Sequence, residues 1–312
     1  MNKTLALSRA EGFVLLKPKD LSDMKAMRVR DGSTLSSPAT LRLRSGQAPP
    51  GEGQTGAGGE RTEDSLQEGW FVWKMTNQIA SRGILIVGVG GLGVPAAIAA
   101  VRAGVPRLGL VDPDPVELSN LHRQVIYGAS DIGVPKVTAA ERRLRQSSPQ
   151  VEIKTHHCEL NPANARAMIE SYDFTIDATD NPLTKFLIND TCVALGRPFA
   201  YGGVLGMTGQ TMTVLPRRTA CLRCLFEEPP DENEIASCRD AGIIGPIAGA
   251  IGEVQAAEAI SYLRGGMPAL AGMMLTYDAK GLGRIRLTPI AARLGCGCGA
   301  AKCPEITDAE PR

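Results

Sequence analysis

The sequence predicts an α/β protein with a doubly wound, Rossmann-like and mostly parallel sheet, an antiparallel C-terminal extension and a zinc knuckle. Three observations lead to this prediction. Apolar strand segments alternate with helical segments from Gly83 onward, a glycine cluster follows the first strand, and alternating strand patterns appear after Gly203. Continuous apolar strands separated by helices are typical of a parallel sheet covered on both faces, and right-handed crossovers make it doubly wound.

The individual elements follow from hydrophobic period and from turn residues. The expected parallel strands are Ile84–Val87, Arg107–Val111, Glu152–Thr155, Phe174–Asp177 and Phe199–Gly202. The expected helices are Gly93–Ala103, Val134–Gln146, Pro162–Ser171 and Pro182–Leu195. Later, "GQTMTVLP", "GMMLTYDA" and "GRIRLTPI" predict antiparallel strands, with one long apolar helix over Pro246–Leu263. Its small residues favour a core helix and are also compatible with a subunit interface.

Residues 1–80 differ in composition from the rest of the chain. The run "STLSSPATLRLRSGQAPPGEGQTGAGGERTED" is rich in Ser, Gly, Pro and Thr and has no strand or helix period. Such a segment cannot bury enough apolar surface to offset the entropy of ordering. We therefore expect a disordered segment over residues 1–80, apart from a short helix within 68–80. Residues 81–300 should form the functional domain, and residues 301–312 a tail.

Charge and hydropathy argue against two classes of partner. The chain has 34 Lys and Arg against 33 Asp and Glu, so its net charge of +1 gives no reason to expect nucleic acid or an anionic membrane. The apolar stretch Ile243–Gly252 is too short to span a bilayer, and no charged-then-apolar leader opens the chain. We expect a cytoplasmic protein.

The glycine cluster predicts a nucleotide site. Gly88, Gly90 and Gly93 fit the pattern G-x-G-x-x-G between a strand and a helix, where backbone N–H groups and the helix N-terminus favour phosphate. Asp112 closes the second strand, where a carboxylate can accept hydrogen bonds from ribose hydroxyls. These residues alone are compatible with NAD.

Polar residues further along favour a triphosphate over NAD. Asn120, Arg123 and Gln124, in "VDPDPVELSNLHRQ", lie just past the ribose position, where an enzyme that stabilises a triphosphate needs them and a dehydrogenase does not. Arg123 can form paired hydrogen bonds with phosphate oxygens, and Lys136 adds a second cation. Asp180, in "DATDN", follows a strand end where open sheets bind ligands, and it is placed to hold Mg²⁺ beside Asn181. The alternative is that Arg123 and Lys136 are surface charges and that Asp180 caps a helix.

Cysteine spacing predicts a metal site. Cys221 and Cys224 have the spacing of a zinc half-site, and more cysteines follow in "GCGCGAAKC". In a chain without a secretion signal, clustered cysteines indicate metal binding or reactivity before disulfides. Cys238 stands apart in an acidic, proline-bearing loop, where Arg239 and the start of a helix would favour its thiolate.

Several of these motifs together resemble one known family. "GVGGLG", "LVDPDPVELSNLHRQ", "IGVPK", "DATDN", "CLRC" and "SCRDAGIIGP" are similar to the adenylating enzymes of sulfur-carrier proteins, the molybdopterin-synthase and thiamine-biosynthesis adenylyltransferases, which are related to ubiquitin-activating enzymes. The resemblance covers about Gly83 to Cys298. It implies ATP-dependent adenylation of the C-terminal glycine carboxylate of a small ubiquitin-like sulfur carrier ending in Gly-Gly, by a homodimer with one structural zinc per subunit.

The resemblance also implies roles for individual residues. Gly91 would lie in the phosphate loop, Asp112 would hold the ribose, and Asp180 would bind Mg²⁺ with Asn181 beside the nucleotide. Lys136 would contact phosphates. The ATP site would be lined by Ser119, Asn120, Leu121, His122 and Arg123.

The same resemblance completes the cysteine assignments. Zinc would be held by Cys221, Cys224, Cys296 and Cys298, with Cys303 as a reserve ligand, although the family's second pair is usually Cys-x-x-Cys. Cys238 matches a cysteine that in some relatives forms a covalent link during sulfur transfer. A sulfur donor, either a cysteine desulfurase or a sulfurtransferase, is then a further partner.

One departure from the family concerns the N-terminal segment. Relatives usually carry an arginine-bearing "R-Y-x-R-Q"-like helix that reaches the partner subunit's ATP site. No such run precedes Gly83, and Arg30, Arg42 and Arg44 do not match it. Two functions therefore stay open besides the disfavoured NAD oxidoreductase: an active adenylyltransferase, and a catalytically weak member that binds ATP and a carrier. The sequence does not indicate which carrier is served.

Overall fold

The computed structural model describes residues 81–229, 242–280 and 283–299. The segment 1–80, with its expected short helix, and the tail 301–312 lie outside the described residues. So do Cys238, Arg239 and Cys303.

The centre of the fold is one sheet of eight strands in the order β3-β2-β1-β4-β5-β6-β7-β8. The first five strands are parallel, and β6, β7 and β8 continue the sheet as antiparallel neighbours. The predicted fold class is therefore confirmed. The strands are β1 (Gly83–Val87), β2 (Arg107–Val111), β3 (Glu152–His156), β4 (Phe174–Asp177), β5 (Phe199–Leu205), β6 (Thr208–Val214), β7 (Met273–Asp278) and β8 (Arg284–Pro289).

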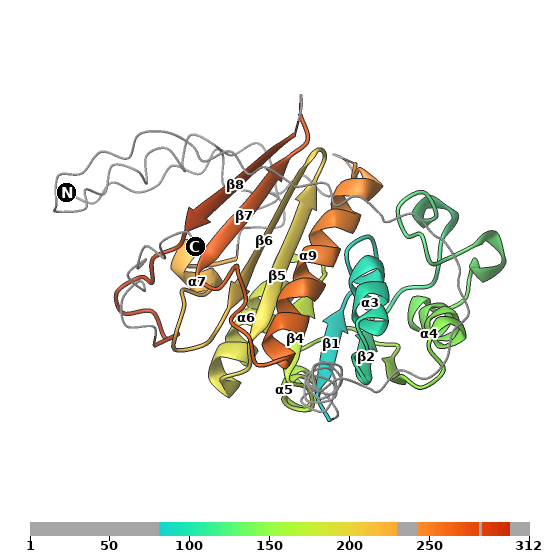
Figure 1. Cartoon of the computed structure of the whole chain (residues 1–312), viewed down its shortest axis with the longest axis horizontal. Helices are drawn as coiled ribbons and strands as arrows, with labels where there is room; N and C mark the ends of the chain where they lie inside the picture. Colours follow the sequence, from blue (N-terminus) through green and yellow to red (C-terminus); the bar gives the residue numbers. More distant parts are fainter. Residues whose placement is uncertain (1–80, 230–241, 281–282, 300–312) are drawn as a thin grey trace, which may run out of the picture. The chain divides into compact units, whose positions relative to one another are not determined.

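Helices cover both faces of this sheet. Figure 1 shows α3 and α9 in front of the sheet and α6 behind it. The helices are α3 (Gly93–Arg102), α4 (Lys136–Ser147), α5 (Ala165–Glu170), α6 (Pro182–Leu195), α7 (Leu222–Leu225) and α9 (Gly245–Leu263), with short 3-10 turns η2 (Leu118–Asn120) and η3 (Ala129–Asp131). The long helix α9 packs against α3 and against the sheet at β4, β5 and β6, as a core helix does.

The order of the parallel strands places a topological switch point between β1 and β4. The chain leaves β1 toward α3 in one direction and leaves β4 toward α6 in the other. In open sheets of this kind, ligands bind beyond the carboxyl ends of the strands at the switch point. The glycine loop follows β1 and the Asp180 segment follows β4, so both predicted site segments lie at this edge.

Two helix boundaries differ from the sequence prediction for local reasons. The helix expected from Val134 begins at Lys136, because Pro135 has an extended backbone with ψ 132°. The helix expected from Pro162 begins at Ala165. There the side chain of Asn161 accepts from the N–H of Ala163, and Asn164 accepts from the N–H of Asn161, so these residues form turns that compete with helix.

No helix in the described part of the chain is long and apolar enough to cross a membrane.

Close packing holds the glycine loop against its neighbours. Gly88 has φ +90°, and a Cβ there would lie 2.6 Å from the carbonyl oxygen of Ala178 after β4. On the other side, a Cβ on Gly252 of α9 would overlap the carbonyl oxygen of Leu92. A Cβ on Gly91 would lie 3.3 Å from the Cβ of Ala248 in the same helix. Glycines at these positions let β4, the loop and α9 approach each other closely.

This packing generates a prediction for two glycines on one helix. Gly252→Ala should lower the free energy of unfolding by about 1–3 kcal/mol, because the added methyl overlaps the backbone of Leu92. Gly249→Ala is the matched control: its nearest neighbour would be Pro95 at 4.0 Å, and alanine favours helix by up to ~1 kcal/mol. Urea denaturation of both variants measures the difference, and equal stabilities would contradict the packing argument.

Candidate functional site

The glycine loop presents a row of unpaired backbone N–H groups. Within the described residues, the N–H groups of Gly90, Gly91, Leu92 and Gly93 have no hydrogen-bond acceptor, and the first α3 bond of this turn runs from Val94 N–H to the Gly90 carbonyl at 3.0 Å. N–H groups at a helix N-terminus carry partial positive charge and favour an anion. The loop therefore has the properties of a phosphate-binding cradle.

A buried carboxylate holds the loop in place from the end of β2. Asp112 Oδ2 accepts a hydrogen bond from Val89 N–H at 2.7 Å, and Oδ1 accepts from Asp114 N–H at 2.9 Å. The residue is 5% exposed, and its burial raises the pKa of the carboxyl, while the charge of Lys136 and these backbone hydrogen bonds oppose that shift. The sequence singled out Asp112 for ribose, and the structure adds this support of the loop.

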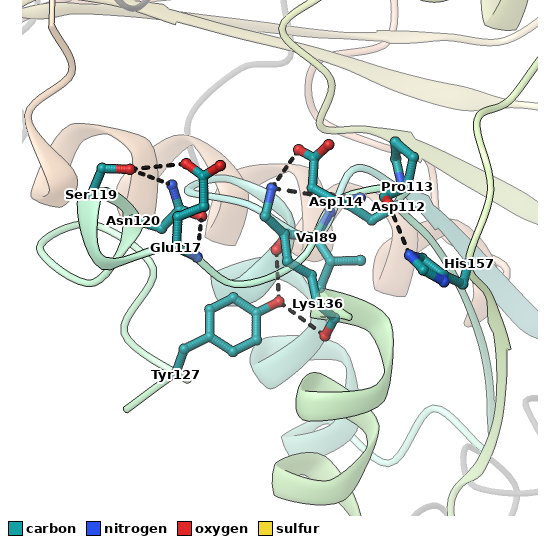
Figure 2. Close-up of polar contacts among 10 residues, drawn as sticks. All are labelled: Val89, Asp112, Pro113, Asp114, Glu117, Ser119, Asn120, Tyr127, Lys136 and His157. Carbon is teal, nitrogen blue, oxygen red and sulfur yellow. Dashed lines mark hydrogen bonds and ion pairs between the residues drawn. The ribbon is translucent and has the colours of Figure 1, made fainter. Parts of the chain in front are cut away.

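Lys136 lies beside two carboxylates in Figure 2. Its Nζ is 2.7 Å from Asp114 Oδ2 and 3.7 Å from Asp112 Oδ1. The chain brings it there because the segments after β2 and before α4 pair: Lys136 N–H donates to the Asp114 carbonyl at 2.9 Å, and Val116 N–H to the Val134 carbonyl at 2.8 Å. Lys136 is 7% exposed, so it is a buried cation and not the surface charge of the alternative interpretation.

The sequence analysis missed two residues that make contacts in this region. The Tyr127 hydroxyl lies 2.8 Å from the carbonyl oxygen of Val89 and 3.2 Å from that of Lys136, so it joins the glycine loop to the start of α4 (Figure 2). Burial, and then the charge of Asp112, raise the pKa of Tyr127, which stays a neutral hydroxyl at physiological pH. Asp114, two residues after Asp112, is the second; only its spacing could have suggested it.

The segment predicted to line the site forms η2 and the turn that follows. Asn120 is buried, with its side-chain oxygen 3.3 Å from Glu117 N–H and its amide nitrogen 3.3 Å from Ser119 Oγ (Figure 2). Arg123 Nη1 donates to the Ser119 carbonyl at 2.8 Å, within its own turn. Leu121 and Arg123 are partly buried, whereas Ser119 and His122 are exposed.

This turn packs against the glycine loop and against α9. A Cβ on Gly91 would lie 4.0 Å from the Arg123 carbonyl oxygen, and a Cβ on Gly245 would lie 3.2 Å from Arg123 Cα. On the opposite side of the loop, a Cβ on Gly88 would lie 3.2 Å from Thr179 N. The structure thus brings the segments around Arg123 and Asp180 to the same glycine loop.

The two residues after β4 have different surroundings. Asn181 caps α6, since its side-chain oxygen accepts from Thr184 N–H at 3.0 Å. Asp180 is exposed and its carboxylate has no partner among the described residues, so it is not the helix cap that the alternative interpretation assigned to it. An exposed, unpartnered carboxylate at a strand end can serve as a ligand for a hard cation.

A buried ion pair that the sequence analysis missed supports this segment. Lys185 Nζ lies 3.2 Å and 3.1 Å from the two carboxylate oxygens of Asp177 and 2.6 Å from the Gly202 carbonyl. Asp177 also accepts from the N–H and the hydroxyl of Thr179. These bonds join the end of β4 and the middle of β5 to α6, which begins just after the turn that carries Asp180. The sequence signal for this ion pair was the position of Lys185, eight residues after Asp177 at the end of β4.

The cysteine cluster has the geometry of a metal site. The sulfur atoms of Cys221, Cys224, Cys296 and Cys298 lie within 4.8 Å of one another. Three of the distances are 4.0 Å (Cys221–Cys224), 3.7 Å (Cys221–Cys296) and 3.6 Å (Cys224–Cys298). Four thiolates bound tetrahedrally at about 2.3 Å from zinc would be separated by about 3.8 Å. The cluster could therefore hold zinc, and among the described residues its four sulfur atoms come from these four cysteines, Cys298 included.

Helix α6 carries this knuckle. The Asn189 side chain accepts from Leu222 N–H at 2.8 Å, and Arg223 forms a two-pronged pair with Asp190 at 2.7 Å and 2.8 Å. The guanidinium of Arg223 also lies over the aromatic ring of Phe186, 5.1 Å from its centre. The hydrogen bond with Cys224, and then burial, raise the pKa of the Cys221 thiol. Because of this shift, Cys221 would become a thiolate alongside its neighbours only when a bound cation balances their negative charge.

Comparison with known proteins identifies the family. The model of the ThiF family matches residues 68–298. A sulfur carrier protein adenylyltransferase from Thermus thermophilus is 41% identical over 201 residues, covering 63% of this chain and 74% of that protein. An adenylyltransferase and sulfurtransferase MOCS3 from Anopheles gambiae is 42% identical over 203 residues, covering 65% of this chain and 46% of that protein. The chain spans about half the length of the MOCS3 relatives it matches.

Solved structures agree on the fold. Escherichia coli MccB superposes with a TM-score of 0.66 at 17% identity, covering 77% of this chain and 71% of MccB. The structure of MccB with ATP gives a TM-score of 0.64 at 18% identity, covering 73% of this chain and 69% of that one. At this identity the likeness concerns the fold alone.

The cysteine geometry generates a prediction. Cys224→Ser should lower the bound zinc of the purified protein from about one equivalent toward zero and lower its melting temperature, because the site loses a ligand and its folding energy. Cys192→Ala is the control, since Cys192 is buried in the core away from the cluster. Mass spectrometry of the metal content reads both variants. Full zinc content in Cys224→Ser would contradict the assignment.

Proposed function

The chain belongs to the ThiF family, and from this premise we propose that it adenylates a ubiquitin-like sulfur-carrier protein. ATP and the C-terminal glycine carboxylate of the carrier would react to give an acyl-adenylate and pyrophosphate. The observation that carries the proposal is the row of unpaired N–H groups from Gly90 to Gly93 beside Lys136, at the switch point of the sheet. The names of the Thermus and Anopheles relatives support the same reaction.

The reaction asks the protein mainly to position and to stabilise charge. A carboxylate oxygen attacks the α-phosphorus, and the bond from this phosphorus to the oxygen bridging to the β-phosphate breaks, so that pyrophosphate leaves with the electron pair. The carboxylate is already ionised at pH 7, so no general base is needed. Preorganised N–H groups and cations facing the phosphates lower the barrier, because negative charge shifts between phosphate oxygens in the transition state.

Each candidate residue has a place in this scheme. The loop N–H groups would bind phosphate, and Asp112 would accept from the ribose while it holds the loop at Val89. Lys136 forms ion pairs with two carboxylates, those of Asp112 and Asp114. The Asp114 side chain is 61% exposed, so a phosphate would displace it from Lys136. Arg123 would release the Ser119 carbonyl to reach a phosphate oxygen. Ser119, Asn120, Leu121 and His122 form the adjoining wall.

Two metal ions belong to the proposal. Asp180, exposed and unpartnered among the described residues, would hold Mg²⁺ with Asn181 beside it; Mg²⁺ is commonly bound by one or two carboxylates and the phosphates of the substrate. When bound, it neutralises charge on the phosphate oxygens. Zn²⁺ would be held by the four-cysteine cluster as a structural ion.

The proposal includes partners and a location. A carrier ending in Gly-Gly supplies the carboxylate, and a cysteine desulfurase or sulfurtransferase would supply sulfur to the adenylate. We also propose a homodimer and a cytoplasmic location, where thiols such as those of the cysteine cluster stay reduced. Neither nucleic acid nor a membrane is part of the proposed function.

Carrier-dependent exchange of labelled pyrophosphate into ATP tests the function, with a panel of ubiquitin-like carriers as substrates. Exchange with at least one carrier is the expected result. Stabilisation by ATP without exchange, for every carrier, would instead favour the catalytically weak member considered from the sequence. No exchange and no stabilisation by ATP would contradict both.

Asp180→Asn should reduce exchange by about 100-fold or more, because the variant removes the charge proposed to hold Mg²⁺ where transition-state charge develops. Melting temperature should stay near wild type, since the Asp180 side chain is exposed. The control is Glu170→Gln, an exposed acid on α5, which leads into the amino end of β4 and lies away from the switch point. Wild-type exchange in Asp180→Asn would show that this carboxylate does not serve the reaction.

Cys238 lies outside the described residues, and we propose for it the covalent role that the resemblance implies. Cys238→Ala should leave exchange at the wild-type rate, since adenylation precedes sulfur transfer, while formation of the carrier thiocarboxylate falls. Mass spectrometry of the carrier after incubation with a sulfur donor measures the thiocarboxylate. Unchanged thiocarboxylate formation would make Cys238 an ordinary loop cysteine.

A further inference from the structure

One side chain beside the glycine loop is buried without a hydrogen bond to any residue that the structure describes. Gln124 is 3% exposed, and its Oε1 has no hydrogen-bond partner among those residues. Its Nε2 donates to no acceptor in the described part of the chain, and it lies against the loop: a Cβ on Gly90 would be 3.4 Å from Nε2. Its backbone N–H, by contrast, is bonded to the Asn120 carbonyl at 3.0 Å.

The other buried carboxamides of the described residues are at least partly satisfied. The side chains of Asn120 and Asn189 are bonded at both ends. Gln255 Nε2 donates to the carbonyls of Asp177 and Ala200 at 2.8 Å and 3.0 Å, and Gln210 Nε2 lies 3.4 Å from Thr276 Oγ1. Among the described residues, Gln124 is thus the buried carboxamide with no hydrogen bond at either end, whichever way its oxygen and nitrogen are assigned.

An unsatisfied buried amide is costly and calls for an explanation. Folding strips such a group of water without replacing the lost hydrogen bonds, so an apolar side chain of the same shape would suit the ligand-free protein better. Groups of this kind persist where a ligand completes them, at sites where function conflicts with stability. Gln124 lies beside Gly90, in the Gly90–Gly93 loop whose N–H groups themselves lack acceptors within the described residues.

We propose that the Gln124 carboxamide is a ligand-contacting, catalytic group of this site and hydrogen-bonds an oxyanion held at Gly90. Its Nε2 donates to a phosphate oxygen of the nucleotide or to the carboxylate of the carrier, and its Oε1 accepts from an N–H or O–H that arrives with the ligand or its hydration. The inference rests on the proposed function, which supplies both anions. It adds a neutral donor to a site otherwise lined by backbone N–H groups and two cations.

Gln124→Met and Gln124→Glu test the proposal, because methionine has a similar shape without polar hydrogen-bonding groups and glutamate adds a charge that repels anions. Without ligand, Gln124→Met should melt at or above the wild-type temperature. The concentration of ATP, with Mg²⁺, that gives half of the maximal rise in melting temperature should be ~10- to 100-fold higher than for the wild type. Gln124→Glu should bind more weakly still. Exchange assays on the same variants give kcat and the KM for the carrier.

The assay arms separate the two anions. A raised ATP midpoint without carrier assigns the contact to phosphate; a normal ATP midpoint with a raised KM for the carrier, or a lowered kcat, assigns it to the carboxylate. Gln255→Met is the comparison, because its amide bonds two backbone carbonyls and its loss should lower the melting temperature in the absence of ligand.

The proposal is overturned if Gln124→Met melts lower than wild type while its ATP midpoint, carrier KM and kcat are unchanged, since the glutamine would then be structural. Failure of the proposed function itself looks different. In that case the wild-type protein shows neither stabilisation by ATP nor exchange with any carrier, before any variant is compared.

Discussion

The structure depends on the close approach of three backbones around the loop between β1 and α3. The Ala178 carbonyl after β4 leaves no space for a side chain at Gly88, and the backbone of Leu92 leaves none at Gly252 of α9. This contact fixes where the N-terminus of α3 lies relative to the end of β4 and to α9. Since the anion-binding capacity of the loop comes from fixed N–H groups, the packing of these glycines is what turns a flexible segment into a preorganised site.

The charges around the loop are arranged to stay buried without a ligand. Asp112 would be costly as a lone buried carboxylate, and burial does raise its pKa, yet Val89 N–H, Asp114 N–H and Lys136 offset that cost. The Lys136 ammonium is in turn balanced by Asp114, whose carboxylate faces solvent. Under the proposed function, a phosphate would replace the exposed carboxylate as the partner of Lys136 without leaving the buried Asp112 unpaired.

Helix α6 connects two parts of the protein that the sequence presents as separate motifs. Its first turn is capped by Asn181, beside the exposed Asp180, and Lys185 in the next turn is bound to Asp177 in the core. Further along the helix, Asn189 and Asp190 hold the cysteine knuckle through Leu222 and Arg223. A buried ion pair is weak evidence for stability, but its geometry is specific, and here it fixes the start of α6 relative to β4 and β5.

How much the sequence could predict depended on whether a residue's role follows from its neighbours in the chain. Strand periods, the glycine pattern and the position of Asp112 at a strand end are local features, so the sheet was predictable, and so was the meeting of the glycine loop with the end of β2. Nucleotide binding at this edge stays a prediction. The pairing of Cys296 and Cys298 with the first cysteine pair was predictable from the resemblance and is confirmed as a cluster. The direction in which a side chain points was not predictable from the sequence, because it depends on packing between segments that are distant in the chain.

Particular side chains show why. Asn181, and not Asp180, caps α6, although both side chains are suited to capping; the difference lies in which residue has the extended backbone that precedes the helix. Arg123 is bonded to its own turn, which its motif could not reveal. The lack of a hydrogen bond at the Gln124 carboxamide depends on how its turn packs against the glycine loop, which the sequence does not report. Unsatisfied polar groups therefore have to be sought in the structure, where each one calls for a physical explanation.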